Sequence, residues 1–362
     1  MARLDEIFDL QMGKTPSRNN ADYWTDGQYD WVSIADLGSY QKYVEDTKER
    51  ISALAVQESG IKSVPANTVI MSFKLSLGKT AITQEPVYTN EAIMAFIPTG
   101  KYAVLPDYFY YLFSAKDWTK GTNRVVMGTT LNKATLGAVS ITVPPIDEQH
   151  KIAAVLDKVS DLIAKRQQQL DKLDEAVKAR FVEIFGDCYT NPHNLPIEKW
   201  NNIFSTTTGK LDSNAAVENG KYPFFTCSKE TLRINTYAFD QEALLLAGNN
   251  AAGKYDVKYY CGKFNAYQRT YVLSLKHDWS YALFRFQLED KLGYLEQQSL
   301  GGLTKYLTLK ILNELEFIVP PKEEQDKFAA FVDQIEKTKT TVSHSLEKLE
   351  TLKKALMQEY FR

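Results

Sequence analysis

Two long stretches of the chain, residues 146–186 and 322–362, carry apolar residues at the three-and-four spacing of an amphipathic helix. Each stretch follows a Pro-Pro pair and has acids in its first turn. Both features suit a helix start, because proline fits the first turn and acids favour the positive end of the helix dipole. The pattern predicts two helices of roughly 50–60 Å each.

The apolar stripe of a helix this long needs a partner, and we expect the two helices to pack on each other as an antiparallel coiled coil. Two unrelated core helices are the less favoured interpretation, because the two stretches match in length and pattern. The side chains expected at the helix–helix contact are Val159, Leu170, Leu173, Val177, Ile335, Leu346, Leu349 and Leu356.

The sequence also repeats itself. Residues 143–157, VPPIDEQHKIAAVLD, reappear without a gap as residues 319–333, VPPKEEQDKFAAFVD. Weaker matches pair 128–136 with 301–309, and Ile7-Phe8 and Gly13-Lys14 with Ile203-Phe204 and Gly209-Lys210. A repeat on this scale predicts a duplicated domain.

Short apolar runs bounded by Gly, Pro and Asn precede each long helix and predict strands, and residues 106–113 and 279–286 predict short helices between them. The fold class is therefore α+β, with two repeated mixed domains separated by two long helices. The expected boundaries are 1–145 for the first domain, 146–186 for its helix, 187–321 for the second domain and 322–362 for the second helix.

Composition adds the compartment and excludes some site types. The 362 residues suffice for two domains, and no apolar run reaches the length of a membrane span. The first residues lack the apolar segment of a secretory signal, and the three cysteines are odd in number and scattered, which suits reduced thiols in the cytoplasm. The four histidines are scattered too, so we expect no metal site.

Several motif fragments fail as catalytic sites. Gly13-Lys-Thr and Gly78-Lys-Thr end like phosphate-binding loops, but Phe8 and Phe73 occupy the place of the required earlier glycine. The two Val-Pro-Pro sequences lack the polar residue and the aromatic residue with which amino-methyltransferases hold a flipped base. No Gly-x-Gly turn is present to bind S-adenosylmethionine, so we expect a protein without catalysis of its own.

Two mixed domains, each ending in a strand, Pro-Pro, Glu-Gln and a long amphipathic helix, resemble the specificity subunit of type I restriction-modification enzymes over essentially the whole chain. The resemblance implies that each domain is a target-recognition domain that reads one half of a bipartite, asymmetric DNA site, while the helices fix the unread spacer and dock partners. The implied partners are double-stranded DNA, two methyltransferase subunits and, in the full complex, two restriction subunits that translocate and cut. S-adenosylmethionine, ATP and Mg²⁺ would be bound by those partners and no cofactor by this chain.

The net charge is only −2, whereas a DNA-binding protein is expected to carry an excess of basic residues. Basic residues are locally enriched, however, because residues 61–84 contain three lysines and no acid, and residues 246–276 contain a single acid, Asp256. Base reading requires Arg or Lys for guanine and Asn or Gln for adenine. The candidates of these types are Lys74, Lys79, Arg124 and Asn132 in the first domain and Asn249, Asn250, Lys254, Gln268, Arg269 and Lys305 in the second.

Each candidate also has a structural interpretation. The Asn249-Asn250 pair suits a turn, Arg269 suits an ion pair on a strand, and Lys79 suits a solvated surface. Two other functions remain open at this point: a coiled-coil scaffold that binds proteins and never reads DNA, and a nuclease whose site residues are too distant in sequence to be recognised.

Overall fold

The computed structural model describes residues 1–74, 76–118, 131–251 and 253–361. The chain divides into two compact units, which we call unit 1 (Met1–Gln167 with Ser345–Arg362) and unit 2 (Gln168–His344). Each unit combines one mixed α/β domain with part of both long helices. The compact units therefore cut the helices, whereas the boundaries expected from the sequence separate the helices from the domains.

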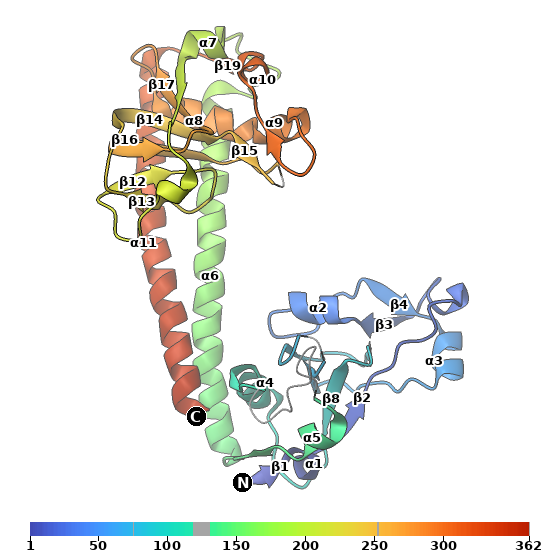
Figure 1. Cartoon of the computed structure of the whole chain (residues 1–362). Coiled ribbons are helices and arrows are strands. Elements are labelled where there is room, and N and C mark those ends of the chain that lie inside the picture. Colours follow the sequence, from blue (N-terminus) through green and yellow to red (C-terminus); the bar gives the residue numbers. More distant parts are fainter. Residues whose placement is uncertain (75, 119–130, 252, 362) are drawn as a thin grey trace. The chain divides into compact units, whose positions relative to one another are not determined.

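The domain of unit 1 is built on a four-stranded antiparallel sheet with strand order β2-β8-β5-β6 and a three-stranded sheet with order β4-β3-β7 (Figure 1). Its elements are β1 (Ala2–Arg3), α1 (Leu4–Ile7), β2 (Phe8–Met12), η1 (Ala21–Tyr23), β3 (Tyr29–Val32), α2 (Ile34–Ser39), β4 (Glu49–Ile51), α3 (Ala53–Ser59), β5 (Val69–Ser72), β6 (Thr80–Ile82), β7 (Tyr88–Thr89), β8 (Ile93–Pro98), α4 (Pro106–Ala115), α5 (Lys133–Gly137) and β9 (Ser140–Ile141).

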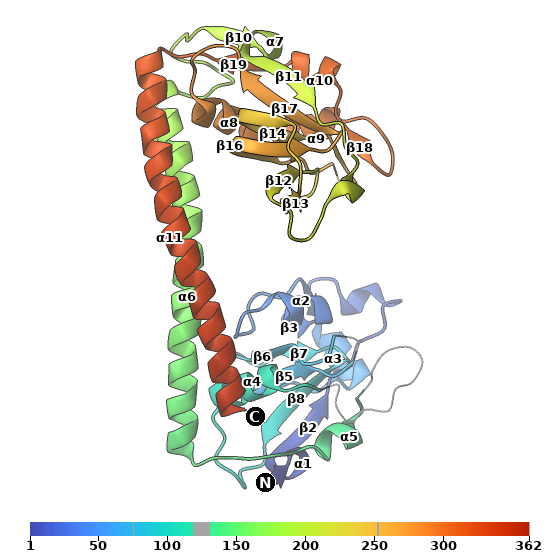
Figure 2. The same ribbon diagram turned by 60° about the vertical axis from the view of Figure 1, so that its left-hand side comes forward.

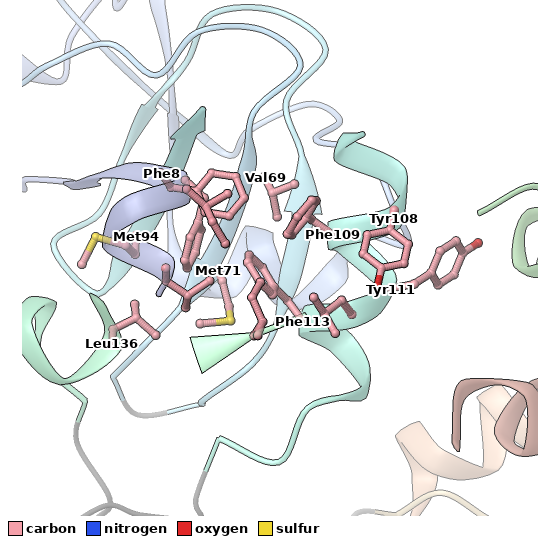
Figure 3. Close-up of a cluster of buried hydrophobic side chains, with 14 of the residues drawn as sticks. Phe8, Val69, Met71, Met94, Tyr108, Phe109, Tyr111, Phe113 and Leu136 are labelled. Atoms are coloured by element: carbon pink, nitrogen blue, oxygen red, sulfur yellow. The ribbon is translucent and has the colours of Figure 1, made fainter. Parts of the chain in front are cut away.

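Aromatic rings of β2, β8 and α4 fill the core of unit 1 (Figure 3). Phe8 lies edge-on against Phe109, with ring centroids 5.0 Å apart, and Phe113 packs against both rings and against Phe96. Tyr111 points away from these rings, and its hydroxyl donates to Asp157 Oδ1 of the long helix at 2.7 Å. Helix α4 therefore holds the sheet on one side and the long helix on the other, and each buried ring contributes about 1.5–3 kcal/mol.

The domain of unit 2 is built on a six-stranded sheet with order β11-β17-β14-β16-β12-β13 (Figure 1). Its elements are β10 (Ile197–Lys199), α7 (Trp200–Ile203), β11 (Phe204–Thr208), η2 (Ser213–Ala215), β12 (Tyr222–Phe225), β13 (Leu232–Ile234), β14 (Phe239–Ala247), β15 (Asn249–Asn250), β16 (Val257–Ala266), β17 (Thr270–Leu275), α8 (Tyr281–Asp290), α9 (Leu292–Gln298), β18 (Lys305–Tyr306), α10 (Leu309–Asn313) and β19 (Glu316–Ile318).

The two domains share one plan, as the sequence repeat predicts. In each, a four-residue helix leads directly into the first long strand, α1 into β2 and α7 into β11. In each, a strand pairs antiparallel with the next strand and parallel with a later one: β3 with β4 and β7, and β12 with β13 and β16. The mixed α/β architecture with two copies and two long helices confirms the expected fold class.

One part of the sequence repeat is wrong in register. The match of 128–136 to 301–309 would pair Asn132 with Lys305. In the structure, Asn132 is instead equivalent to Thr308, because each is the N-cap of the short helix that follows it. Their carbonyl oxygens also accept equivalent backbone hydrogen bonds, from the Leu136 N–H and the Leu312 N–H. Capping geometry fixes the register more strictly than the short local similarity.

The long helices α6 (Ile146–Phe185) and α11 (Lys322–Tyr360) contain 40 and 39 residues. Within unit 2 they lie side by side and run in opposite directions (Figure 2). Phe181 packs edge-on against Phe328 at 5.7 Å, and Asp174, two turns earlier in α6, forms a 2.8 Å ion pair with Lys339, three turns later in α11. The two helices are therefore antiparallel.

The side chains expected at the helix contact are all buried or half-buried. Val159 is buried, and the other seven are half-buried. Val177 packs against the core of unit 2 and Leu356 against the core of unit 1, so these two also contact the domains. As helix–helix contacts, all eight stay predictions.

A buried glutamine joins each domain to its long helix. In unit 1, the Leu105 N–H donates to Gln149 Oε1, and Gln149 Nε2 donates to the carbonyl oxygens of Ala103 and Pro144, all at 2.9 Å. In unit 2, the Ser280 N–H donates to Gln325 Oε1 at 3.0 Å. Both glutamines are the final residue of the Pro-Pro-x-x-Glu-Gln sequence, so this part of the repeat has a structural role.

We predict that Gln325→Leu lowers the free energy of unfolding by roughly 1–3 kcal/mol, because the buried Ser280 N–H and Pro320 carbonyl lose their partner. Urea unfolding followed by circular dichroism measures the loss. Gln334→Leu, at an exposed position of the same helix, is the matched control and should change stability by less than about 0.5 kcal/mol. Equal stability of the two variants would contradict the anchoring role of Gln325.

Candidate nucleic-acid interface

The polar candidates of unit 2 converge on one cluster of loops, which we call the unit 2 loop cluster (residues 248–251, 253–254, 267–269 and 299–306). Strand β15 pairs with β18 so that Asn249 lies opposite Tyr306 and Asn250 opposite Lys305. The Gly248 N–H donates to the Arg269 carbonyl at 2.8 Å, which brings the third loop alongside. Residues more than fifty positions apart in sequence therefore share one surface.

Glycines allow this close approach of backbones. A Cβ atom at Gly248 would lie 2.3 Å from the Arg269 carbonyl oxygen, so no other residue fits there without a shift. Gly253 has a φ of +71°, and the stem of Lys305 packs beside it. Lys254, which follows Gly253, is exposed to solvent.

The candidates of this cluster differ in whether their side chains already form hydrogen bonds or ion pairs within the protein. Gln268 is exposed, and its Nε2 donates to Asp212 Oδ2 at 3.3 Å. Arg269 is exposed, and within the described residues its guanidinium forms neither an ion pair nor a hydrogen bond, so the expected pairing with an acid is absent there. An uncommitted guanidinium is the group best suited to bind guanine or phosphate.

The unit 1 candidates lie on the equivalent loops. Lys74 and Lys79 flank the β5–β6 turn, and the Leu131 N–H donates to the Phe73 carbonyl as Leu307 does to Gly248 in unit 2. Lys74 is half-buried, with its ammonium 5.1 Å from the Phe73 ring centroid, and Lys79 is exposed, with its ammonium against Gly38 of α2. Arg124 lies outside the described residues.

Asn132 has a structural task. It is the N-cap of α5: the Thr135 N–H donates to its side-chain oxygen at 2.8 Å, while the Thr135 hydroxyl oxygen accepts from the Asn132 N–H. The cap holds the side chain in place through its oxygen, so Asn132 cannot turn freely toward a base and is a weaker base-reading candidate than the sequence alone indicates.

The sequence did not single out four further polar residues of these loops. Asp212 holds Gln268 in unit 2. In unit 1, the loop after β2 meets the loop after β7 in the same way: Asn90 Nδ2 donates to Thr15 Oγ1 at 3.0 Å, and the Thr15 hydroxyl donates to Glu91. The one signal that could have found two of them is the repeated Gly-Lys pair at Gly13 and Gly209, which is followed directly by Thr15 in the first copy and, one residue later, by Asp212 in the second.

Nothing in the described part of the chain forms a metal site, since no group of three or more His, Cys, Asp or Glu side chains has a suitable arrangement. Among those same residues, no helix is both long enough and apolar enough to cross a membrane.

Comparisons with known proteins agree with this geometry. Residues 1–175 and 199–351 match the family described as the type I restriction modification DNA specificity domain. The chain belongs to this specificity family. The specificity subunit of the type I restriction enzyme MjaIX from Methanocaldococcus jannaschii is 25% identical over 376 residues, which cover 92% of this chain and 85% of that protein.

Other members of the specificity family match in part or in fold. The EcoDI specificity subunit from Escherichia coli is 35% identical over 162 residues, covering 43% of this chain and 35% of that protein. The crystal structure of a type I restriction-modification S subunit from M. genitalium covers 99% of this chain and 95% of that chain, with a TM-score of 0.66 at 14% identity. The second comparison shows a shared fold, and the family match identifies the chain as a DNA specificity subunit.

We predict that substitution of a candidate that caps a helix lowers the stability of the protein more than substitution of an exposed candidate. Asn132→Ala removes a helix cap and should lower the free energy of unfolding by about 1 kcal/mol. Arg269→Ala removes an exposed side chain that has no partner among the described residues and should change the free energy of unfolding by less than about 0.5 kcal/mol. Chemical unfolding of both variants beside the parent protein decides, and a cost for Arg269→Ala as large as that for Asn132→Ala would mean that Arg269 is structural.

Proposed function

We propose that this specificity subunit reads a bipartite, asymmetric DNA site, with one half-site bound by the loops of unit 1 and the other by the loops of unit 2. The observation that carries the proposal is the repeated arrangement of exposed polar loops on two copies of one frame, in a member of the DNA specificity family. Different loop residues on the same frame suit two different half-sites.

The long helices fit the part of a spacer and a docking platform. Their length of about 60 Å follows from a rise of 1.5 Å per residue. In this proposal they set the number of unread base pairs between the half-sites, and they bind two methyltransferase subunits and, in the full complex, two restriction subunits. The chain itself is non-catalytic and binds no cofactor. Its partners bind S-adenosylmethionine, ATP and Mg²⁺ and supply much of the contact with the DNA backbone, which accounts for the small net charge of this chain.

The proposal predicts a split methylation motif. Cells that express this chain with its cognate methyltransferase subunit should carry methyladenine at a two-part sequence with a fixed gap, and cells that express the methyltransferase subunit alone should not. Single-molecule sequencing of genomic DNA measures both. A folded complex without new methylation would favour the protein scaffold, and DNA cleavage by the purified chain alone would favour the nuclease.

We further predict that loop substitutions act on one half-site each. Arg269→Ala should relax or weaken recognition of one half by about 1–3 kcal/mol, the usual worth of a bidentate base contact, and Lys79→Ala should affect only the other half. Methylation rates on duplexes with single substitutions in either half measure the effect. If both variants changed the same half-site, the assignment of one half-site to each unit would be wrong.

A further inference from the structure

The two copies differ where the domain meets the long helices. In unit 1, a lysine of the same chain occupies this place: Lys42 forms ion pairs with Asp107 of α4, at 2.6 Å, and with Asp157 of α6. Its ammonium also lies 5.3 Å from the ring centroids of both Tyr43 and Tyr111. Burial alone would lower the pKa of Lys42, but the hydrogen bonds to both aspartates raise it above its ordinary value, so the ammonium stays charged.

The equivalent place in unit 2 is an open groove of ≈ 820 Å³. It is lined by α6, α11, α8 and the strands β14 and β16, and six of its lining side chains are carboxylates against three cations. Two of the cations are already committed, because Arg285 pairs with Glu289 and Lys339 pairs with Asp174. The groove is therefore rich in negative charge.

Asp333 relates the groove of unit 2 to the Lys42 site of unit 1. It stands at the position of Asp157 in the repeat, 176 residues further along the gapless match of 143–157 to 319–333. Within the described residues, Asp333 has no ion pair or hydrogen bond. Nearby, the Tyr259 hydroxyl donates to Glu242 at 2.6 Å, and burial together with the charges of Glu242 and Asp333 raises the pKa of Tyr259. Asp333, Glu242 and Tyr259 thus bring to one groove the kinds of group that surround Lys42, namely two carboxylates and a tyrosine, and Asp333 does so from the equivalent position.

The segment that would fill the groove is missing from the second copy. In unit 1, residues 33–48 connect β3 to β4 and include α2 and Lys42. In unit 2, residues 226–231 alone connect the equivalent strands, β12 and β13. Val177, which matches Lys353 of unit 1 in the repeat, brings no charge to the groove. Two lysines, Lys178 and Lys339, line the groove, but both lie on the long helices, and the connection of β12 to β13 brings none to it.

We propose that this groove of unit 2 binds a lysine side chain of a partner protein chain, held between Asp333, Glu242 and Tyr259 as Lys42 is held in unit 1. The partner is the methyltransferase subunit, so this inference rests on the proposed function. The first copy itself shows which chemical group the site takes, a primary ammonium on an apolar stem. Such a contact gives the second unit a docking site that the first unit fills with its own chain.

Carbodiimide coupling tests the proposal, because it joins a carboxylate to an amine only when the two are in contact. We expect mass spectrometry of the complex with the cognate methyltransferase subunit to find the peptide with Asp333, or that with Glu242, joined to a lysine of that subunit. The pair of Lys42 with Asp157 should couple within this chain and serves as the positive control. Coupling of Asp333 or Glu242 to a lysine of this chain, or no coupling of either while the control succeeds, would overturn the proposal; coupling of Lys339 to Asp174 is expected with or without the partner, because the two form an ion pair.

Substitution gives an independent readout. The double variant Asp333→Asn with Glu242→Gln should weaken assembly with the methyltransferase subunit about tenfold or more. Glu323→Gln, an exposed carboxylate of the same helix outside the groove, should leave assembly unchanged. Circular dichroism checks that the double variant is folded. Assembly of the double variant as tight as that of the parent would overturn the proposal.

The same samples distinguish the two levels of inference. If the parent complex methylates a split site and the double variant assembles equally well, the groove proposal fails and the proposed function stands. If the parent chain forms no complex with the methyltransferase subunit and directs no methylation, both fail. Free spermidine should compete with assembly only at concentrations far above those of the proteins, because a docked segment gains further contacts; competition at similar concentrations would instead identify a polyamine site.

Discussion

The arrangement of each unit depends on a buried side-chain amide at the start of its long helix. Gln149 and Gln325 are fully buried, at 0% and 1% exposure. A glutamine is suited to this place because its oxygen accepts a backbone N–H at the start of the short helix while its nitrogen donates to the carbonyl of the first proline. A glutamate would bring a charge into the same space, and an apolar residue would leave both backbone groups without a partner.

These hydrogen bonds fix three elements at once: the Pro-Pro turn, the first turn of the long helix and the short helix α4 or α8. The short helix in turn carries core aromatic residues, Phe109 and Phe113 in one copy and Phe284 in the other. The sheet packs on that core, and the polar loops lie at the ends of its strands. The position of a base-reading candidate such as Arg269 is therefore set through a chain of packed elements that begins at the glutamine.

The sequence predicts this frame well because the frame is built from periodic patterns. The amphipathic spacing and the Pro-Pro starts predicted the two helices, and the gapless repeat of 143–157 predicted the duplication. The register near Asn132 was wrong because it was taken from the short similarity of 128–136 to 301–309. The correct register follows from the helix caps, which depend on backbone geometry. The loops were harder still: the contact of Asp212 with Gln268 and that of Thr15 with Glu91 join distant segments, and no pattern along the chain encodes them.

Candidate residues on the loops were chosen by chemical type, and chemical type does not distinguish a residue that contacts a base from one that caps a helix. Asn132 and Arg269 are both polar, exposed loop residues, yet Asn132 caps a helix, whereas the Arg269 guanidinium has no partner in the part of the chain that the structure describes. The same limit explains why the ammonium site of unit 1 was not expected. Lys42 becomes informative only when Asp107 and Asp157, from two other elements, are seen beside it.

The two domains can share one frame and still differ in their surfaces, because backbone atoms hold each domain to its long helix. The partners of Gln149 and Gln325 are backbone atoms, so the anchor does not depend on the side chains of the loops. Residues 33–48 and 226–231 could therefore diverge in length, one bringing a lysine to the helices and the other leaving carboxylates open, while both domains kept the same junction. The anchor does not depend on the side chains of the loops at the strand ends either, and for this reason the loops of one copy can change without disturbing the frame of the other.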